Sequence, residues 1–206
     1  MEMKVRILTK AEELFSRYGI RSVTMDEIAN QLGISKKTIY LSFVNKDELV
    51  EEVFNVYMNE NKRHCLEDRQ EAENAVHEIF LAMDMMDDLS KALNTSILFD
   101  LEKYHPNTFH KFKAFKNNFL YNVISENLKR GMQEEVFRTN VNVDVITRMR
   151  LSTVMLSMNI ELFPPGKYKM ADVEIEILMH YLYGVATAKG IKLIQKYSSQ
   201  RQKIKA

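Results

Sequence analysis

The sequence predicts an all-α protein, and three observations support this fold class. The 206 residues contain only 6 Gly and 3 Pro, which are too few for the many turns of an all-β sandwich. Apolar residues recur at spacings of three and four along most of the chain, as they do on amphipathic helices. Residues that favour helix starts precede several of these stretches. Because 46% of the residues are hydrophobic and 28% are charged, the chain can bury a core and is not disordered throughout.

The first two predicted helices have clear ends. A helix over residues 5–18 is followed by Gly19, which suits a helix C-cap. Thr24 with Glu27 three residues later forms a capping box, which predicts the start of a second helix. This second helix ends at Gly33. We therefore expect one helix over residues 5–18 and a second between Thr24 and Gly33.

A third and a fourth helix follow at once. Ser35 caps a short helix that runs through Phe43, and Asn45 caps the next one. The second helix, a four-residue turn that contains Gly33 and the third helix together have the geometry of a helix-turn-helix. Later helices are expected near residues 71–86, 88–103, 106–130, 143–162 and 171–198.

The outward face of the third helix is basic. Lys36 and Lys37 lie at its N-terminus, where the helix dipole disfavours positive charge. Phosphates or guanine edges would neutralise them, so this face is a candidate nucleic-acid surface. The side chains expected to form it are Ser35, Lys36, Lys37, Thr38 and Tyr40, with Lys46 extending the basic edge and Arg21 within reach of another phosphate. The alternative is a solvated lysine pair on a three-helix bundle.

These residues resemble a known family. Thr24 to Phe43 and Asn45 to Leu49 closely resemble the DNA-binding domain of TetR-family transcriptional regulators, and Ala11 to Phe15 and Tyr18-Gly19 share its pattern. The resemblance covers residues 5–50. A weaker one is that of Gly131 to Arg138 to a loop between two helices of the family's regulatory domain.

The resemblance implies both an architecture and an activity. A three-helix helix-turn-helix domain at residues 1–48 would bind a palindromic operator in double-stranded DNA. A helical bundle at residues 49–206 would form a homodimer and bind a small-molecule effector. The protein would be a ligand-responsive regulator, most often a repressor. By position, Thr24 would contact a phosphate, Lys36, Lys37 and Thr38 would face base edges, and Tyr40 and Lys46 would bind phosphates.

The C-terminal part offers an apolar surface for an effector. Phenylalanines recur at spacings of three and four from residue 109 to residue 119, and methionines lie on other predicted helices. Tyr121 and Asn159 are candidate polar groups that would orient a ligand. The full candidate set is Met83, Phe112, Phe115, Phe119, Tyr121, Met155 and Asn159. For any one apolar member, a place in an ordinary packed core is the alternative interpretation.

The last predicted helix is the candidate dimer surface. Gly184 and Ala188 are four residues apart, which would let another helix approach closely on that face. Gly184 and Gly190 both lie in this helix and each costs about 1 kcal/mol relative to alanine, for which close packing is one compensation. A kink or a fraying end is the alternative. The candidate interface residues are Tyr181, Gly184, Val185, Ala188 and Ile191.

Other function classes find little support. The sequence contains no zinc-protease, P-loop or dinucleotide motif, and we expect neither an enzyme nor a cofactor. A cation at Asp84, Asp87 and Asp88 is less favoured than a solvated turn. The net charge is +1 overall but −8 over residues 51–100, a segment that would repel nucleic acid. Without an apolar leader or an 18-residue apolar run, we expect a cytoplasmic protein without a membrane partner. The alternative function is a helical small-molecule-binding module that does not recognise DNA.

Overall fold

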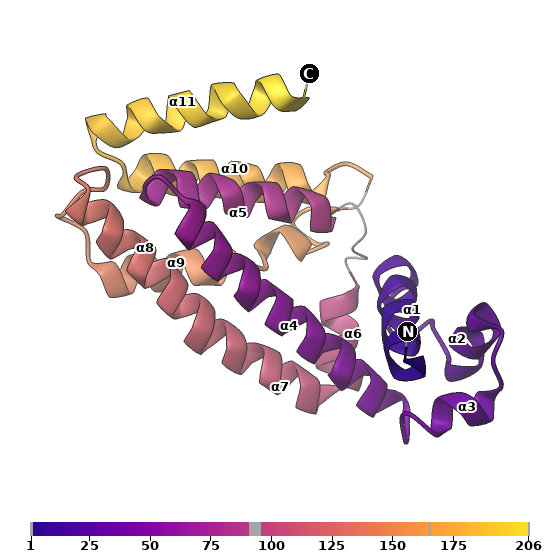
Figure 1. Cartoon of the computed structure of the whole chain (residues 1–206). Helices are drawn as coiled ribbons and strands as arrows, with labels where there is room; N and C mark the ends of the chain where they lie inside the picture. The colour runs from indigo at the N-terminus through magenta and orange to yellow at the C-terminus, as the bar shows by residue number, and fades with distance from the viewer. Residues whose placement is uncertain (1, 91–95, 165, 206) are drawn as a thin grey trace. The chain divides into compact units, whose positions relative to one another are not determined.

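The computed structural model describes residues 2–90, 96–164 and 166–205, and the regular elements in these ranges are helices (Figure 1). The predicted all-α fold class is confirmed. The helices are α1 (Met3–Tyr18), α2 (Met25–Leu32), α3 (Lys36–Tyr40), α4 (Lys46–Glu71), α5 (Ala75–Ser90), α6 (Ile97–Tyr104), α7 (Pro106–Phe115), α8 (Tyr121–Gln133), α9 (Val143–Thr153), α10 (Met170–Val185) and α11 (Ala188–Lys205). A π-helical turn (Lys116–Leu120) precedes α8, and a 3-10 turn (Leu156–Met158) follows α9.

The chain divides into two compact units. The first contains α1, α2, α3, α4 up to Lys62, α6 and α7. The second contains α4 from Arg63 onward, α5 and α8 to α11. These units do not follow the predicted division into residues 1–48 and 49–206, because the first unit also takes in more of α4 and two later helices.

The core of the first unit is built on the N-terminal helices. The cap residues behave as the sequence predicts: the Glu27 N–H donates to Thr24 Oγ1 at 3.1 Å, and the Glu48 N–H donates to Asn45 Oδ1 at 2.9 Å. The third helix ends at Tyr40 rather than at Phe43. The fully buried side chains of α1, α2, α3 and the segments between them are Ile7, Ala11, Ile20, Val23, Ile28 and Ile39, and Phe43 is 1% exposed.

The sixth helix holds two parts of the first unit in place. The buried Asp100 carboxylate accepts the Arg21 N–H at 2.9 Å, in the loop before α2. At the end of α6, His105 Nδ1 lies 2.6 Å from Asp47 Oδ1 in the first turn of α4. The segment that carries the helix-turn-helix is therefore fixed from both of its ends by side chains that follow residue 96.

The second unit has one continuous apolar core. In this core α5 lies against α10 and α11 (Figure 1). Its buried members include Val76, Phe80, Met83, Leu128, Phe137, Leu178, Leu182 and Ile194. At one end Arg130 of α8 donates to the nearly buried Glu78 carboxylate at 3.1 Å, to Glu134 at 2.7 Å and to the Ala72 carbonyl at 2.8 Å. This network ties α8 to the α4–α5 connection.

Three long predicted helices are shorter in the structure. The helix predicted over 106–130 is interrupted by the π-helical turn, and the one predicted over 143–162 ends at Thr153. The helix predicted over 171–198 is broken after Val185. There the Thr187 N–H donates to the Val136 carbonyl at 2.9 Å, and its hydroxyl donates to the Glu135 carbonyl at 2.8 Å. These contacts replace the helical hydrogen bonds and separate α10 from α11.

Two glycines of the second unit allow close approach. A Cβ atom on Gly190 would overlap with the Val136 carbonyl oxygen, which is backbone and cannot rotate away. A Cβ atom on Gly131 would overlap with the ring of the buried Phe137. A Cβ atom on Gly184 would meet nothing within 4 Å. Close approach to the Val136 carbonyl therefore explains Gly190, whereas the protomer shows no such contact for Gly184.

The pKa of Asp68, on α4 in the second unit, predicts a pH effect. Burial raises this pKa from 3.8 to about 6, with smaller contributions from neighbouring glutamates. The folded state then binds the proton more tightly than the unfolded state, so this group's contribution to stability grows as the pH falls from about 7 to about 4. We expect Asp68→Asn to raise the thermal midpoint at pH 7.5 and to have no effect near pH 4.

The control is Asp144, a carboxylate whose pKa is lowered rather than raised. A hydrogen bond from Tyr121 lowers the pKa of the exposed Asp144, so Asp144→Asn should reduce stability at neutral pH. Thermal melts of both variants at several pH values test the assignment. An advantage of Asp68→Asn that persists unchanged at pH 4 would contradict it.

The described part of the chain contains no candidate metal-binding group and no candidate membrane-spanning helix. No group of three or more metal-ligating side chains occurs among the described residues. Of the three candidate cation ligands, Asp84 forms an ion pair with Arg201 at 2.6 Å. The structure does not describe the side chains of Asp87 and Asp88. Over the same described ranges, no helix is both long enough and apolar enough to cross a bilayer.

Candidate nucleic-acid interface

The turn between α2 and α3 has the backbone that its sequence predicts. Gly33 has φ +65°, a left-handed conformation that favours glycine. The Gly33 N–H donates back to α2, and the Ile34 N–H donates to the Ala29 carbonyl at 3.0 Å. At the start of α3, Ser35 Oγ accepts the Thr38 N–H at 3.1 Å and lies 2.8 Å from Thr38 Oγ1. The predicted Ser35 and Thr38 thus build the cap that fixes α3.

The outer side of α3 and the turn after it are unusually exposed. Lys37 is exposed, and the Tyr40 side chain is 44% exposed. Leu41 and Val44 are 79% and 77% exposed, the two highest values among the large apolar side chains of the described residues. Val44 was not among the predicted site residues, since its type alone suggests a core position.

Lys36 has a charged neighbour that the sequence did not indicate. Its Nζ lies 2.8 Å from the Asp26 carboxylate on α2, and both side chains are more than half exposed. The hydrogen bond to Asp26 raises the pKa of Lys36. This pair is exposed and screened by solvent, so it contributes little to stability. Its effect is to balance the charge of Lys36 locally, whereas Lys37 has no ion pair with any residue that the structure describes.

Lys46 occupies a different place from the one expected. Its Nζ donates to the Ile20 carbonyl at 2.6 Å, and burial lowers its pKa. The side chain therefore joins the start of α4 to the loop after α1 instead of forming a solvent-facing basic edge. A phosphate contact through Lys46 stays a prediction.

Arg21 and Thr24 lie near the entrance to α2. The Arg21 guanidinium carbon lies 5.3 Å from the centre of the Tyr104 ring, so this ring orients the exposed arginine. Thr24 is exposed, and its hydroxyl serves as the N-cap of α2. Both side chains belong to the same unit as α3.

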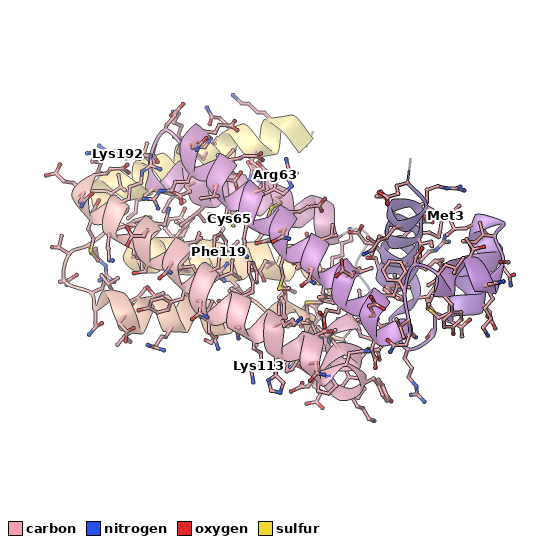
Figure 2. All side chains as sticks on the ribbon, turned by 60° about the horizontal axis from the view of Figure 1, so that its bottom comes forward. Met3, Arg63, Cys65, Lys113, Phe119 and Lys192 are labelled. Carbon is pink, nitrogen blue, oxygen red and sulfur yellow. The ribbon has the colours of Figure 1, made fainter. Side chains whose placement is uncertain are left out.

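The seven effector candidates are divided between the two units. Phe112 and Phe115 are buried in the first unit, and Met83 is buried in the core of the second. Figure 2 labels Phe119 on the π-helical turn, where it is half-buried.

The remaining candidates are the polar ones and Met155. The Tyr121 hydroxyl donates to Asp144 at 2.6 Å. Met155 is half-buried, beside the 3-10 turn. Asn159 is exposed, and its side chain accepts the Glu161 and Leu162 N–H groups within its own turn. Asn159 therefore stabilises a turn rather than lining a buried surface.

The dimer candidates also need correction. Tyr181 and Val185 are only 5% and 2% exposed within the protomer and belong to the core of the second unit. They are buried too deeply to offer surface to a partner. Gly184 and Ala188 are exposed. Because Gly184 lies on α10 and Ala188 begins α11, they do not share one face of a single helix. Ile191 is half-buried on α11.

Comparison with known proteins identifies the family. Residues 7–53 match the family model "Bacterial regulatory proteins, tetR family". The HTH-type transcriptional regulator YvaF of Bacillus subtilis is 27% identical over 190 residues, which cover 90% of this chain and 96% of that relative. Residues 7–53 therefore belong to the tetR family of bacterial regulatory proteins. This matched part contains α2, α3 and most of α1, with the start of α4.

Solved structures of transcriptional regulators share the fold. A regulator from Marinobacter aquaeolei superposes with a TM-score of 0.73 at 18% identity, over 96% of this chain and 99% of that one. FadR from Bacillus subtilis, solved in complex with stearoyl-CoA, superposes with a TM-score of 0.65 at 18% identity, over 88% of this chain and 98% of that one. The relatives named here are regulators rather than enzymes.

Proposed function

We propose that this protein is a TetR-family repressor that binds a palindromic operator as a homodimer and is released by a small apolar or aromatic effector. The observation that carries the DNA-binding part is the outer side of α3. A short helix, fixed by Gly33 and the Ser35 cap, presents Lys37, Tyr40 and Leu41 to solvent. An exposed lysine beside an aromatic and an aliphatic side chain fits a phosphate together with apolar groove edges.

The proposed mechanism depends on spacing. In a symmetric dimer the two α3 helices enter successive major grooves, so the half-sites lie about one helical turn, roughly 34–36 Å, apart. An effector releases the protein only if it binds a conformer with a different spacing more tightly than the DNA-bound one. The apolar core of the second unit and the FadR complex with stearoyl-CoA support an effector with an apolar body.

Selection from a pool of random duplexes tests this function. We expect enrichment of a palindrome, with an affinity that falls about 10³–10⁵-fold between 50 and 200 mM salt for 6–10 phosphate contacts. The protein should first be stripped of any co-purified ligand. If no palindrome is enriched, the protein is instead a helical small-molecule-binding module that does not recognise DNA.

Lys37→Ala should weaken binding to the selected duplex and reduce the salt slope by about 1 for each phosphate contact that is lost. The charge-matched control is Lys113→Ala, an exposed lysine of α7. Titrations at four salt concentrations measure both slopes. Equal slopes for the two variants would contradict the role of Lys37.

A further inference from the structure

A buried polar cluster lies between α9 and α10 in the second unit. Arg150 and Glu174 are each 6% exposed, and Arg150 Nη2 lies 3.4 Å from Glu174 Oε1. The Arg150 guanidinium also donates to Thr153 Oγ1 at 3.0 Å. The distance in the ion pair is long for a charge-assisted hydrogen bond, so each partner keeps capacity for another one. The Glu174 carboxylate also accepts a hydrogen bond from the buried Ser157 side chain. Both members of the ion pair are more than nine-tenths buried.

Three oxygens of this region have no hydrogen-bond partner among the described residues: Thr147 Oγ1, Glu174 Oε2 and Tyr181 Oη. Thr147 precedes Arg150 by three residues on α9, and Tyr181 follows Glu174 by seven on α10, so each pair shares a helix face. The charge of Arg150 acts on Tyr181, where it opposes the increase in pKa that burial causes. The unpartnered groups therefore lie around Arg150, which pairs with Glu174, acts on Tyr181 and follows Thr147 by one helical turn.

Unpartnered buried polar groups lower the stability of a folded protein. Buried polar atoms in folded proteins nearly always have partners, because an unpaired one loses its hydration without compensation. Only one other unpartnered buried side-chain atom, Ser198 Oγ, occurs in the described part of the chain. Costly polar groups that are concentrated in one place are typical of sites built for a ligand.

We propose that Tyr181, Thr147 and Glu174 bind the uncharged polar group of the effector, a carboxamide or a hydroxyl on an apolar body. This inference rests on the proposed function and specifies the chemistry of its effector. Two hydroxyls are available to donate, and one carboxylate oxygen is available to accept. An amide offers a carbonyl to the hydroxyls and an N–H to Glu174 Oε2.

The charges of Arg150 and Glu174 disfavour an ionic ligand at this site. Arg150 and Glu174 already balance one another, and an additional buried charge would have no counterion. The neighbouring buried residues on the two helices, Leu151, Val173 and Leu178, are apolar and suit the remainder of the ligand. The site therefore favours neutral groups over a carboxylate or an ammonium of the same shape.

Five probes of matched shape test the proposal on the full chain: benzamide, benzyl alcohol, benzoate, benzylamine and toluene. We expect benzamide and benzyl alcohol to bind at least tenfold more tightly than the other three in ligand-observed NMR titrations. Tyr181→Phe should remove this preference, with a loss of at least tenfold for benzamide. The matched control is Tyr183→Phe, which alters an exposed tyrosine of the same helix and should leave binding unchanged.

Stability gives a second readout without ligand. Removing an unpartnered buried hydroxyl should stabilise the protein, so Tyr181→Phe should raise the melting temperature by about 2–4 °C, whereas Tyr183→Phe should not. A lower melting temperature would show that an ordered water or another partner satisfies the Tyr181 hydroxyl and would overturn the proposal.

The binding outcomes separate this inference from the function on which it rests. Equal affinity of benzamide for the wild type and for Tyr181→Phe, tighter binding of benzoate, or no binding of either neutral polar probe overturns the inference. If the palindrome is still enriched in those cases, DNA recognition stands and the effector binds elsewhere. A failed duplex selection removes the proposed function whatever the probes show.

Discussion

Replacing Gly190 by alanine is expected to lower the free energy of unfolding by about 3 kcal/mol. The added Cβ would overlap with the Val136 carbonyl oxygen, which also accepts hydrogen bonds from the N–H and the hydroxyl of Thr187. Overpacking alone costs about 1–3 kcal/mol, and each weakened hydrogen bond adds about 1 kcal/mol. The junction between α10 and α11 would therefore open before the rest of the second unit.

Gly184→Ala is the matched control, because it adds the same methyl group to a helical glycine with no atom within 4 Å. It should stabilise the protomer by about 0.5–1 kcal/mol through the higher helix propensity of alanine. Urea unfolding of both variants measures the difference. If Gly190→Ala proved as stable as Gly184→Ala, the tight contact at Val136 would not exist in solution. Because Gly184 is a candidate interface residue, the oligomeric state of each variant should be checked alongside.

Arg130→Met is expected to destabilise the protein by about 3 kcal/mol. The change removes the ion pair to Glu78, whose side chain is only 7% exposed, together with the hydrogen bond to the Ala72 carbonyl. Loss of one partner from a buried pair leaves an uncompensated charge and typically costs about 3–5 kcal/mol. The lower end applies here, because the Arg130 side chain is 23% exposed.

Lys129→Met is the control for the lost positive charge. Lys129 is the neighbouring residue, and it pairs with Glu126 on the surface, so its replacement should change stability by less than about 0.5 kcal/mol. Chemical unfolding of Arg130→Met with and without Glu78→Gln tests the cause. The defect of Arg130→Met should shrink when Glu78 is replaced by the neutral glutamine, and an equal defect in both backgrounds would contradict the assignment to an unpaired carboxylate.

The parts of the fold that depend on neighbouring residues could be predicted from the sequence. Thr24, Ser35 and Asn45 each cap a helix as expected, because a cap is made within three residues of the chain. Gly33 adopts the expected left-handed conformation for the same reason. The helix-turn-helix is therefore specified almost entirely by local interactions.

The errors have a common physical origin in contacts between distant residues. The break after α10 is made by hydrogen bonds from Thr187 to carbonyls about fifty residues earlier, whereas the apolar periodicity continues across the break. Lys46 reaches the carbonyl of Ile20, and Tyr181 is buried in its own protomer, for similar reasons. Periodicity shows that a helix has an apolar face but does not show which surface covers that face.

The candidate site was predictable only in part. The basic start of α3 is visible in the sequence, but the neutralising contact between Lys36 and Asp26 joins residues on two different helices. The exposure of Val44 and the polar cluster around Arg150 and Glu174 gave no signal either. Residue type alone assigns a valine to a core and an arginine to a surface, and the structure reverses both.

The construction of α3 bears on how such a protein changes its target over generations. Of the five residues in this helix, Ile39 alone is buried, and its start depends on the preceding Ser35. Lys36, Lys37 and Tyr40 are exposed and place few demands on folding, whereas Thr38 is part of the cap. On the proposed function, substitutions at these three positions change which duplex is bound and leave the scaffold intact. A duplicated copy of the gene would then acquire new targets through a few substitutions in one short segment.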